Sequence, residues 1–111
     1  MVPLFAGHTY ILTFDNGAVF HNAYSADGTE LHWQATAGPL SGQSGTVALN
    51  VAEVGSETYF VSWIEADTET TVSHVMDLSA WTVHAFWTYP VDNGRTGELH
   101  AGTFELAPDD G

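Results

Sequence analysis

Apolar and polar residues alternate along short segments throughout the chain. A period of two is typical of β-strands buried on one face, and these segments are rich in the β-branched and aromatic residues that strands favour. No segment of helical length shows the apolar repeat of about 3.6 residues. The pattern predicts eight strands, at about residues 8–14, 18–25, 29–36, 46–54, 58–65, 69–77, 81–89 and 98–105.

Residues that favour turns separate the predicted strands. Asp15-Asn16-Gly17 and Ala26-Asp27-Gly28 are strong hairpin signals, residues 38–45 form a Gly/Ser-rich loop, and residues 90–97 form the longest connection. Successive hairpins predict an all-β, antiparallel up-and-down sheet. Eight such strands are expected to close into a barrel, because closure removes both unpaired edges. The interior of such a barrel is filled by side chains or holds one small ligand, and a β-sandwich is the alternative fold.

Length and composition predict one domain over residues 1–111, with residues 106–111 as a frayed tail. The chain has no cysteine, which excludes disulfides and thiolate chemistry. No apolar run approaches the length of about 18 residues that spans a membrane, and the N-terminus lacks the basic flank and apolar core of a signal peptide. We therefore expect a cytoplasmic protein.

The charge is strongly unbalanced. Fourteen acidic residues face Arg95 alone, and the net charge is −13. Such a chain repels phosphate backbones and anionic membrane surfaces, so neither nucleic acid nor membrane is an expected partner. Most acidic residues fall at predicted turns and strand ends, which favours a role in solubility.

Glu65 is a candidate acid–base residue. It ends the alternating segment 61–65 on the same face as Trp63, so an inward face would hold a carboxyl group against aromatic surface. Burial disfavours the charged form and can tune a carboxyl group for proton transfer. The alternative is that the strand ends at the rim and Glu65 meets water.

His74 is the candidate partner of Glu65. It shares a face with Val72 and Met76 on the next predicted strand, and a diagonal approach to Glu65 depends on the register. A carboxylate that orients an imidazole is a common acid–base arrangement near neutral pH. The alternative is a structural histidine within a polar patch. The other histidines are scattered, so no metal site is expected.

Aromatic residues suggest a ligand site. In the segment 81–89, Trp81 and Trp87 share a face with the small Ala85 between them, which would leave a slot for a planar molecule. The alternative is that these rings only fill the core. The loop at 38–45 lacks the lysine of a phosphate-binding loop and is better interpreted as a mobile flap over the mouth of the barrel.

Five landmarks occur in the order seen in a known family: Gly7-His8-Thr9-Tyr10, the hairpin Thr13–Gly17, Gly38-Pro39-Leu40-Ser41-Gly42, Val61–Glu65 and Val72–Val75. In this, the chain resembles the MoaF-like proteins over roughly residues 7 to 90. The resemblance implies a small barrel of the lipocalin/calycin type. More distantly, the chain resembles the bacterial phenolic acid decarboxylases, which are dimeric, cofactor-free barrels, and this implies a homodimer.

The decarboxylase activity does not carry over. That family binds the substrate carboxylate with two tyrosines and an arginine, and this chain has Leu12, Phe14 and Gln43 at the matching positions. These side chains lack the charge-assisted donors that a carboxylate clamp requires. Only Glu65 matches, at the position that the family uses for the phenol end of its substrate.

We therefore expect a barrel that binds a small, mostly apolar, aromatic or unsaturated molecule, with cofactor-free lyase or isomerase chemistry at Glu65 as a further hypothesis. The alternatives are a non-catalytic, lipocalin-like carrier and a solidly packed dimerisation domain. No metal or cofactor is expected. The candidate catalytic residues are Glu65 and His74, and the candidate substrate-binding residues are Tyr10, Leu12, Phe14, Gln43, Trp63, Ala85 and Trp87.

Overall fold

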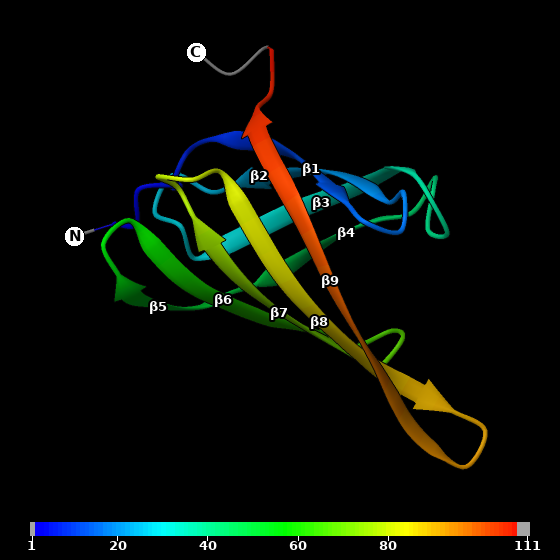
Figure 1. The fold of residues 1–111 in the computed structure, drawn as a ribbon. Coiled ribbons are helices and arrows are strands. Elements are labelled where there is room, and N and C mark those ends of the chain that lie inside the picture. Colours follow the sequence, from blue (N-terminus) through cyan, green and yellow to red (C-terminus); the bar gives the residue numbers. More distant parts are fainter. Residues whose placement is uncertain (1, 109–111) are drawn as a thin grey trace.

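The computed structural model describes residues 2–108 and is an all-β, antiparallel fold (Figure 1). The alternating segments form strands because each buries one side of its pleat and exposes the other. Within the described residues there are nine strands: β1 (Thr9–Phe14), β2 (Val19–Tyr24), β3 (Glu30–Ala37), β4 (Ser44–Ala48), β5 (Asn50–Gly55), β6 (Thr58–Glu65), β7 (Thr70–Asp77), β8 (Thr82–Val91) and β9 (Gly94–Leu106).

The nine strands form a nearly closed, barrel-shaped sheet. The order is β4-β3-β2-β1-β9-β8-β7-β6-β5. Most strands pair with their neighbours in sequence. The exceptions are β4 and β5, which are consecutive but not paired, and β1 and β9, which are paired although they lie at opposite ends of the chain. The β1–β9 pairing runs from Tyr10↔Leu106 to Phe14↔Gly102. Thr36 of β3 forms a β-bulge, because Val19 pairs with Ala37 and Phe20 pairs with Ala35, which leaves Thr36 without a partner in β2. Such bulges increase the local bend of a strand.

The prediction of eight strands was wrong, because the segment at 46–54 is divided at Leu49. Its first part, β4, pairs with β3, whereas its second part, β5, pairs with β6. One bent segment thus spans the gap between the two ends of the sheet. The predicted connection at 90–97 was also wrong. There β8 and β9 stay paired to Val91↔Gly94 and form a hairpin that projects beyond the barrel (Figure 1).

One end of the barrel is filled by the N-terminal segment. Phe5 is fully buried, and its ring centroid lies 4.6 Å from that of Tyr24 and 5.4 Å from that of Tyr59. The Leu4 amide donates a hydrogen bond of 3.2 Å to the Tyr59 hydroxyl. Large side chains from the strand ends that meet here complete the packing: Tyr10, Leu31, Met76, Val83 and Phe104.

The C-terminal part is held more firmly than the sequence suggested. Leu106, expected in the frayed tail, belongs to β9, and the Ala107 amide donates a 2.9 Å hydrogen bond to the Thr9 carbonyl. The rest of that predicted tail, residues 109–111, lies outside the described residues. Among residues 2–108, no helix is long and apolar enough to cross a membrane.

A substitution at Gly102 can test the close packing of β9 against β1. A Cβ atom at this position would overlap the Thr13 carbonyl oxygen and approach Phe14 Cδ1 to 2.9 Å. We expect Gly102→Ala to lower the free energy of unfolding by about 1–3 kcal/mol, as overpacking does elsewhere, in urea denaturation. Gly94→Ala is the control, because nothing lies within 4 Å of its added Cβ. An unchanged unfolding free energy for Gly102→Ala would contradict this tight β1–β9 contact.

Candidate functional site

A cavity of about 440 Å³ occupies the end of the barrel opposite Phe5. This volume lies within the usual range of small-molecule sites, about 300–1,000 Å³. Its walls come from the C-terminal ends of β1, β6 and β8, the N-terminal ends of β2, β7 and β9, the middle of β3 and three loops. The lining residues are Phe14, Asn16, Phe20, Asn22, Trp33, Pro39, Leu40, Gln43, Trp63, Glu65, Thr68, Thr70, Val72, His74, Trp87, Tyr89, Pro90 and Glu98.

The register aligns one row of the lining across four strands. Trp63 of β6 pairs with Val72 of β7, Val72 pairs with Trp87 of β8, and Trp87 pairs with Glu98 of β9. Two indoles therefore flank one small aliphatic side chain. Glu98 pairs with Trp87 across the strands. Glu65 lies two residues after Trp63, on the same face of β6.

Aromatic rings form the greater part of the remaining wall. Phe20 contacts both Trp33 and Trp87, with ring centroids 6.1 Å apart in each pair. Phe14 contacts Phe20 at 5.9 Å and Trp87 at 5.6 Å. These rings meet mostly edge to face, a favourable arrangement that fixes their orientation. The cavity is thus bounded by a connected set of rings rather than by flexible side chains.

Glu65 is half-buried at the end of β6 and faces the cavity. Its Oε2 accepts a 2.9 Å hydrogen bond from Trp63 Nε1. Burial raises the pKa of the Glu65 carboxyl group, and the hydrogen bond from Trp63 opposes this shift only in part. The sequence prediction of a carboxyl group held against aromatic surface agrees with this geometry.

His74 is buried in the middle of β7, opposite Val61 and Ala85. Its ring lies 4.8 Å from Trp63 between centroids, and burial lowers the pKa of His74 to about 3. The imidazole is therefore neutral near pH 7. The register pairs Glu65 with Thr70, and the ring beside His74 is that of Trp63, so the structure does not form the direct Glu–His pair that one register would have allowed.

Three buried polar atoms in the lining lack a hydrogen-bond partner in the described structure: Asn22 Oδ1, Trp33 Nε1 and His74 Nδ1. Their residues are only 2%, 7% and 3% exposed, respectively. A buried polar atom without a partner costs about 1–3 kcal/mol. Such atoms therefore mark places where a bound molecule could gain hydrogen bonds.

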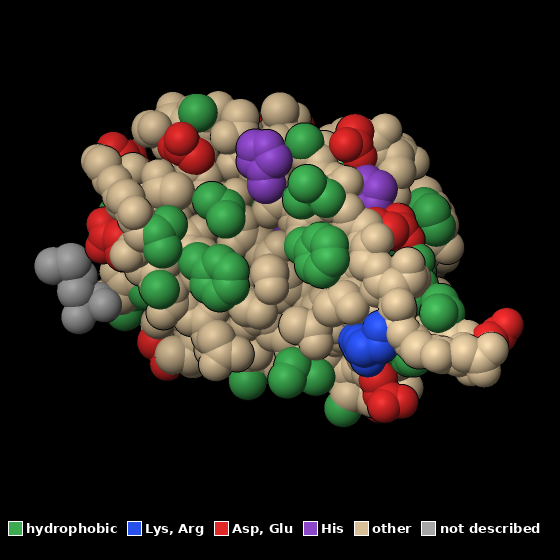
Figure 2. Space-filling view, turned by 60° about the horizontal axis from the view of Figure 1, so that its bottom comes forward, with side chains coloured by type: hydrophobic (Ala, Val, Ile, Leu, Met, Phe, Trp, Pro, Cys, Tyr) green, Lys and Arg blue, Asp and Glu red, His purple; other side chains and the backbone are tan. Residues whose placement is uncertain are grey.

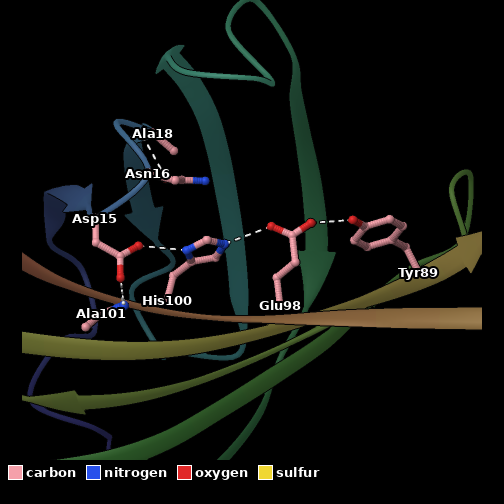
Figure 3. Close-up of polar contacts among 7 residues, drawn as sticks. All are labelled: Asp15, Asn16, Ala18, Tyr89, Glu98, His100 and Ala101. Carbon is pink, nitrogen blue, oxygen red and sulfur yellow. Dashed lines mark hydrogen bonds and ion pairs between the residues drawn. The ribbon is translucent and has the colours of Figure 1, made fainter.

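Four side chains form a hydrogen-bonded chain at the cavity rim, which we call the rim cluster: Asp15, Tyr89, Glu98 and His100 (Figure 3). The Tyr89 hydroxyl donates a hydrogen bond to Glu98 Oε2. His100 Nε2 lies 2.9 Å from Glu98 Oε1, and His100 Nδ1 lies 2.7 Å from Asp15 Oδ1. The Glu98 carboxylate, with Asp15, raises the pKa of His100, while Tyr89 and His100 lower the pKa of Glu98. The cluster thus favours a protonated His100 between two carboxylates.

Sequence reasoning missed the rim cluster. Glu98 and His100 share one face of a predicted strand, which was a usable signal, but Tyr89 comes from β8 and Asp15 from the turn between β1 and β2. Only the β1–β9 closure brings Asp15 beside His100, and the Ala101 amide then donates to Asp15 Oδ2 at 3.1 Å.

The structure distributes the predicted site residues over both ends of the barrel. Tyr10, Leu12 and Ala85 are buried in the core and are not among the lining residues. The slot expected between Trp81 and Trp87 is also absent, because Trp81 precedes β8, has a φ of 60° and packs on Phe104 at the filled end. The predicted residues that line the cavity are Phe14, Gln43, Trp63, Glu65, His74 and Trp87.

Within residues 2–108, no three His, Asp or Glu side chains are grouped so that they could hold a metal ion. The expectation of no metal site remains a prediction.

The fold and site define a small antiparallel β-barrel with an aromatic cavity at one end. The sequence matches the family described as MoaF-like over residues 6–102, and the chain belongs to this family. It is similar to a crystal structure from Burkholderia vietnamiensis that is provisionally described as a beta-lactamase, with 31% sequence identity, a TM-score of 0.86 and coverage of 96% of this chain and 99% of that chain. No curated protein gives a significant match.

His74 predicts a pH dependence of stability. Between pH 6.5 and about 3 the unfolded chain binds a proton at His74 that the folded chain does not, so stability falls as the pH falls. We expect His74→Leu to remove this contribution, which amounts to about 1.4 kcal/mol per pH unit below 6.5. Urea denaturation of both proteins at several pH values between about 7.5 and 5 measures the difference. Parallel pH profiles for the two proteins would show that His74 is not held neutral.

Proposed function

We propose that this protein binds a small, mostly apolar, aromatic or unsaturated molecule in the cavity. The observation that carries the proposal is the 440 Å³ space bounded by six aromatic rings from β1, β2, β3, β6 and β8. Flat aromatic walls favour a planar or unsaturated ligand, because stacking and edge contacts add to the burial of apolar surface. A few polar groups among apolar ones are the usual composition of such sites.

The unpaired polar atoms support the same proposal. Asn22 Oδ1 and Trp33 Nε1 offer an acceptor and a donor from β2 and β3, and His74 Nδ1 lies on β7. A ligand that pairs with any of them removes a desolvation cost that the unliganded barrel carries. The ligand is therefore expected to combine an apolar body with one or two polar groups.

Our proposal does not include a beta-lactamase activity for this chain, although the similar protein from Burkholderia vietnamiensis is provisionally described as a beta-lactamase. Class A beta-lactamases use a nucleophilic serine with a lysine in the same motif. The sequence of this chain contains no lysine, and the lining includes no serine.

Acid–base chemistry at Glu65 is the second candidate function, as a cofactor-free lyase or isomerase step. The supporting observation is a half-buried carboxyl group with a raised pKa, held by Trp63 against the cavity. A compound extracted from the purified protein would serve as the substrate. We expect Glu65→Gln to abolish its conversion at saturating concentration while the far-UV circular dichroism stays unchanged. Equal turnover by wild type and Glu65→Gln would leave binding as the whole function.

A homodimer, implied by the resemblance to the decarboxylases, remains part of this proposal. Figure 2 shows one face on which apolar side chains are exposed, with acidic side chains mainly towards its margin. The exposed apolar residues on the outer face of the sheet include Phe60, Val75, Phe86 and Leu99.

Binding in the cavity can be tested with a substitution at its mouth. Gln43 lies in the exposed loop before β4 and lines the cavity, whereas Ser41 lies in the same loop outside the lining. We expect indole to perturb the amide resonances of lining residues in wild type, and Gln43→Trp to weaken this binding about tenfold by obstructing the mouth. Ser41→Trp, the matched control, should bind indole as wild type does. Perturbations confined to residues outside the lining, or equal affinity in both variants, would contradict the assignment.

A further inference from the structure

The charges of the cavity lining are all of one sign. Glu65 and Glu98 are its carboxylates, and no lysine or arginine lies among the residues that line it. His74 is fully buried and neutral, and the hydrogen bond that Tyr89 donates to Glu98 keeps its hydroxyl protonated. The site is therefore suited to repel an anion and to attract a cation.

The two carboxylates differ in how they are compensated. Glu98 has His100 at 2.9 Å and the Tyr89 hydroxyl as partners, whereas the Glu65 side chain accepts its hydrogen bond from the uncharged indole of Trp63. Arg95, the one permanent cation of the sequence, is bonded to backbone carbonyl groups of the β6–β7 turn and of β8. It donates hydrogen bonds to the carbonyl oxygens of Glu69 and Thr88, at 2.8 and 3.0 Å. Glu65 is thus a half-buried carboxylate for which these residues supply no counter-ion.

Indole rings belong to the same cavity wall as Glu65. Trp63 donates to Glu65 directly, and Trp87 is separated from Trp63 only by Val72 in the register row. The faces of aromatic rings, and of tryptophan above all, attract organic cations, and cages of such rings recognise quaternary ammonium groups. Carboxylate and indole would act on the same charge, in a site partly shielded from water.

A separate observation points the same way. Asn22 Oδ1 is a buried acceptor without a partner, in a residue that is 2% exposed and lines the cavity. An N–H group of a protonated amine would satisfy it. The overall charge of −13 would in addition draw cations towards the protein over long range.

We propose that the ligand of this cavity is an organic cation, a protonated amine or quaternary ammonium group on an aromatic or unsaturated body, with Glu65 as its counter-ion. This inference rests on the proposed binding function and names the chemical class of its ligand. Burial raises the pKa of Glu65, and a cation bound beside the carboxyl group would favour its charged form.

Two probes of nearly equal shape test the charge alone: phenyltrimethylammonium and tert-butylbenzene. We expect chemical-shift titrations of the full chain at physiological ionic strength to show that the cation binds in the cavity about tenfold or more tightly than the neutral probe. Glu65→Gln should remove most of this preference. Glu105→Gln is the matched control, since it removes the same charge from an exposed residue outside the lining.

The outcomes separate the two proposals. Equal or tighter binding of tert-butylbenzene in the cavity would overturn the cationic ligand and leave the proposed binding function standing. Loss of cation affinity in Glu105→Gln as large as in Glu65→Gln would also overturn it, because the attraction would then come from net charge. Failure of both probes to perturb any lining residue would overturn both proposals.

Discussion

The pairing of β9 with β1 closes the sheet around the cavity and assembles the rim cluster. It joins segments about ninety residues apart, from Tyr10↔Leu106 to Phe14↔Gly102, and converts a meander with two free edges into a wall around an interior. The closure of so long a loop costs conformational entropy, which the ladder of hydrogen bonds and the burial of both inner faces must exceed. The same pairing brings Asp15 beside His100 and so assembles the rim cluster. The bent segment of β4 and β5 completes the enclosure on the other side.

The closed barrel is filled at one end only, and this asymmetry defines the site. Phe5 from the N-terminal segment packs against Tyr24 and Tyr59, so the interior at that end is solid. At the opposite end the inward side chains are large rings that contact one another around the cavity. Polar groups accumulate at this end as well, where Glu65 lines the cavity and the rim cluster reaches it through Tyr89 and Glu98. An end that Phe5 fills is thus joined to an open end whose lining residues carry buried polar atoms without a hydrogen-bond partner.

The alternation of residues revealed which face each strand turns inward but not how deep each residue lies. Leu12 and Phe14 share one face of β1, yet Leu12 is in the core and Phe14 lines the cavity. Depth depends on the tilt and register of the strands, and register is not encoded in a period of two. The same limit explains why Ala85 was expected to line a slot and why the direct Glu65–His74 pair did not form.

Other features depend on contacts that no local pattern reports. Phe5 precedes the first predicted strand, so its role as the plug follows only from the closed barrel. The division at Leu49 was hidden because the alternation continues across the bend while the pairing partner changes from β3 to β6. By contrast, Trp63, Glu65 and His74, which line the cavity, were predicted as site residues from the sequence, because an ionisable group on an aromatic, alternating face is informative in itself.

Native mass spectrometry of the protein freshly purified from the cells in which it occurs tests the central claim, that the open end of the barrel holds a small molecule. The account predicts a discrete mass in excess of the polypeptide, which is released on denaturation and identified as an aromatic or unsaturated compound. A mass equal to that of the polypeptide alone, together with an unchanged melting temperature across a panel of neutral and cationic aromatic compounds, would contradict it.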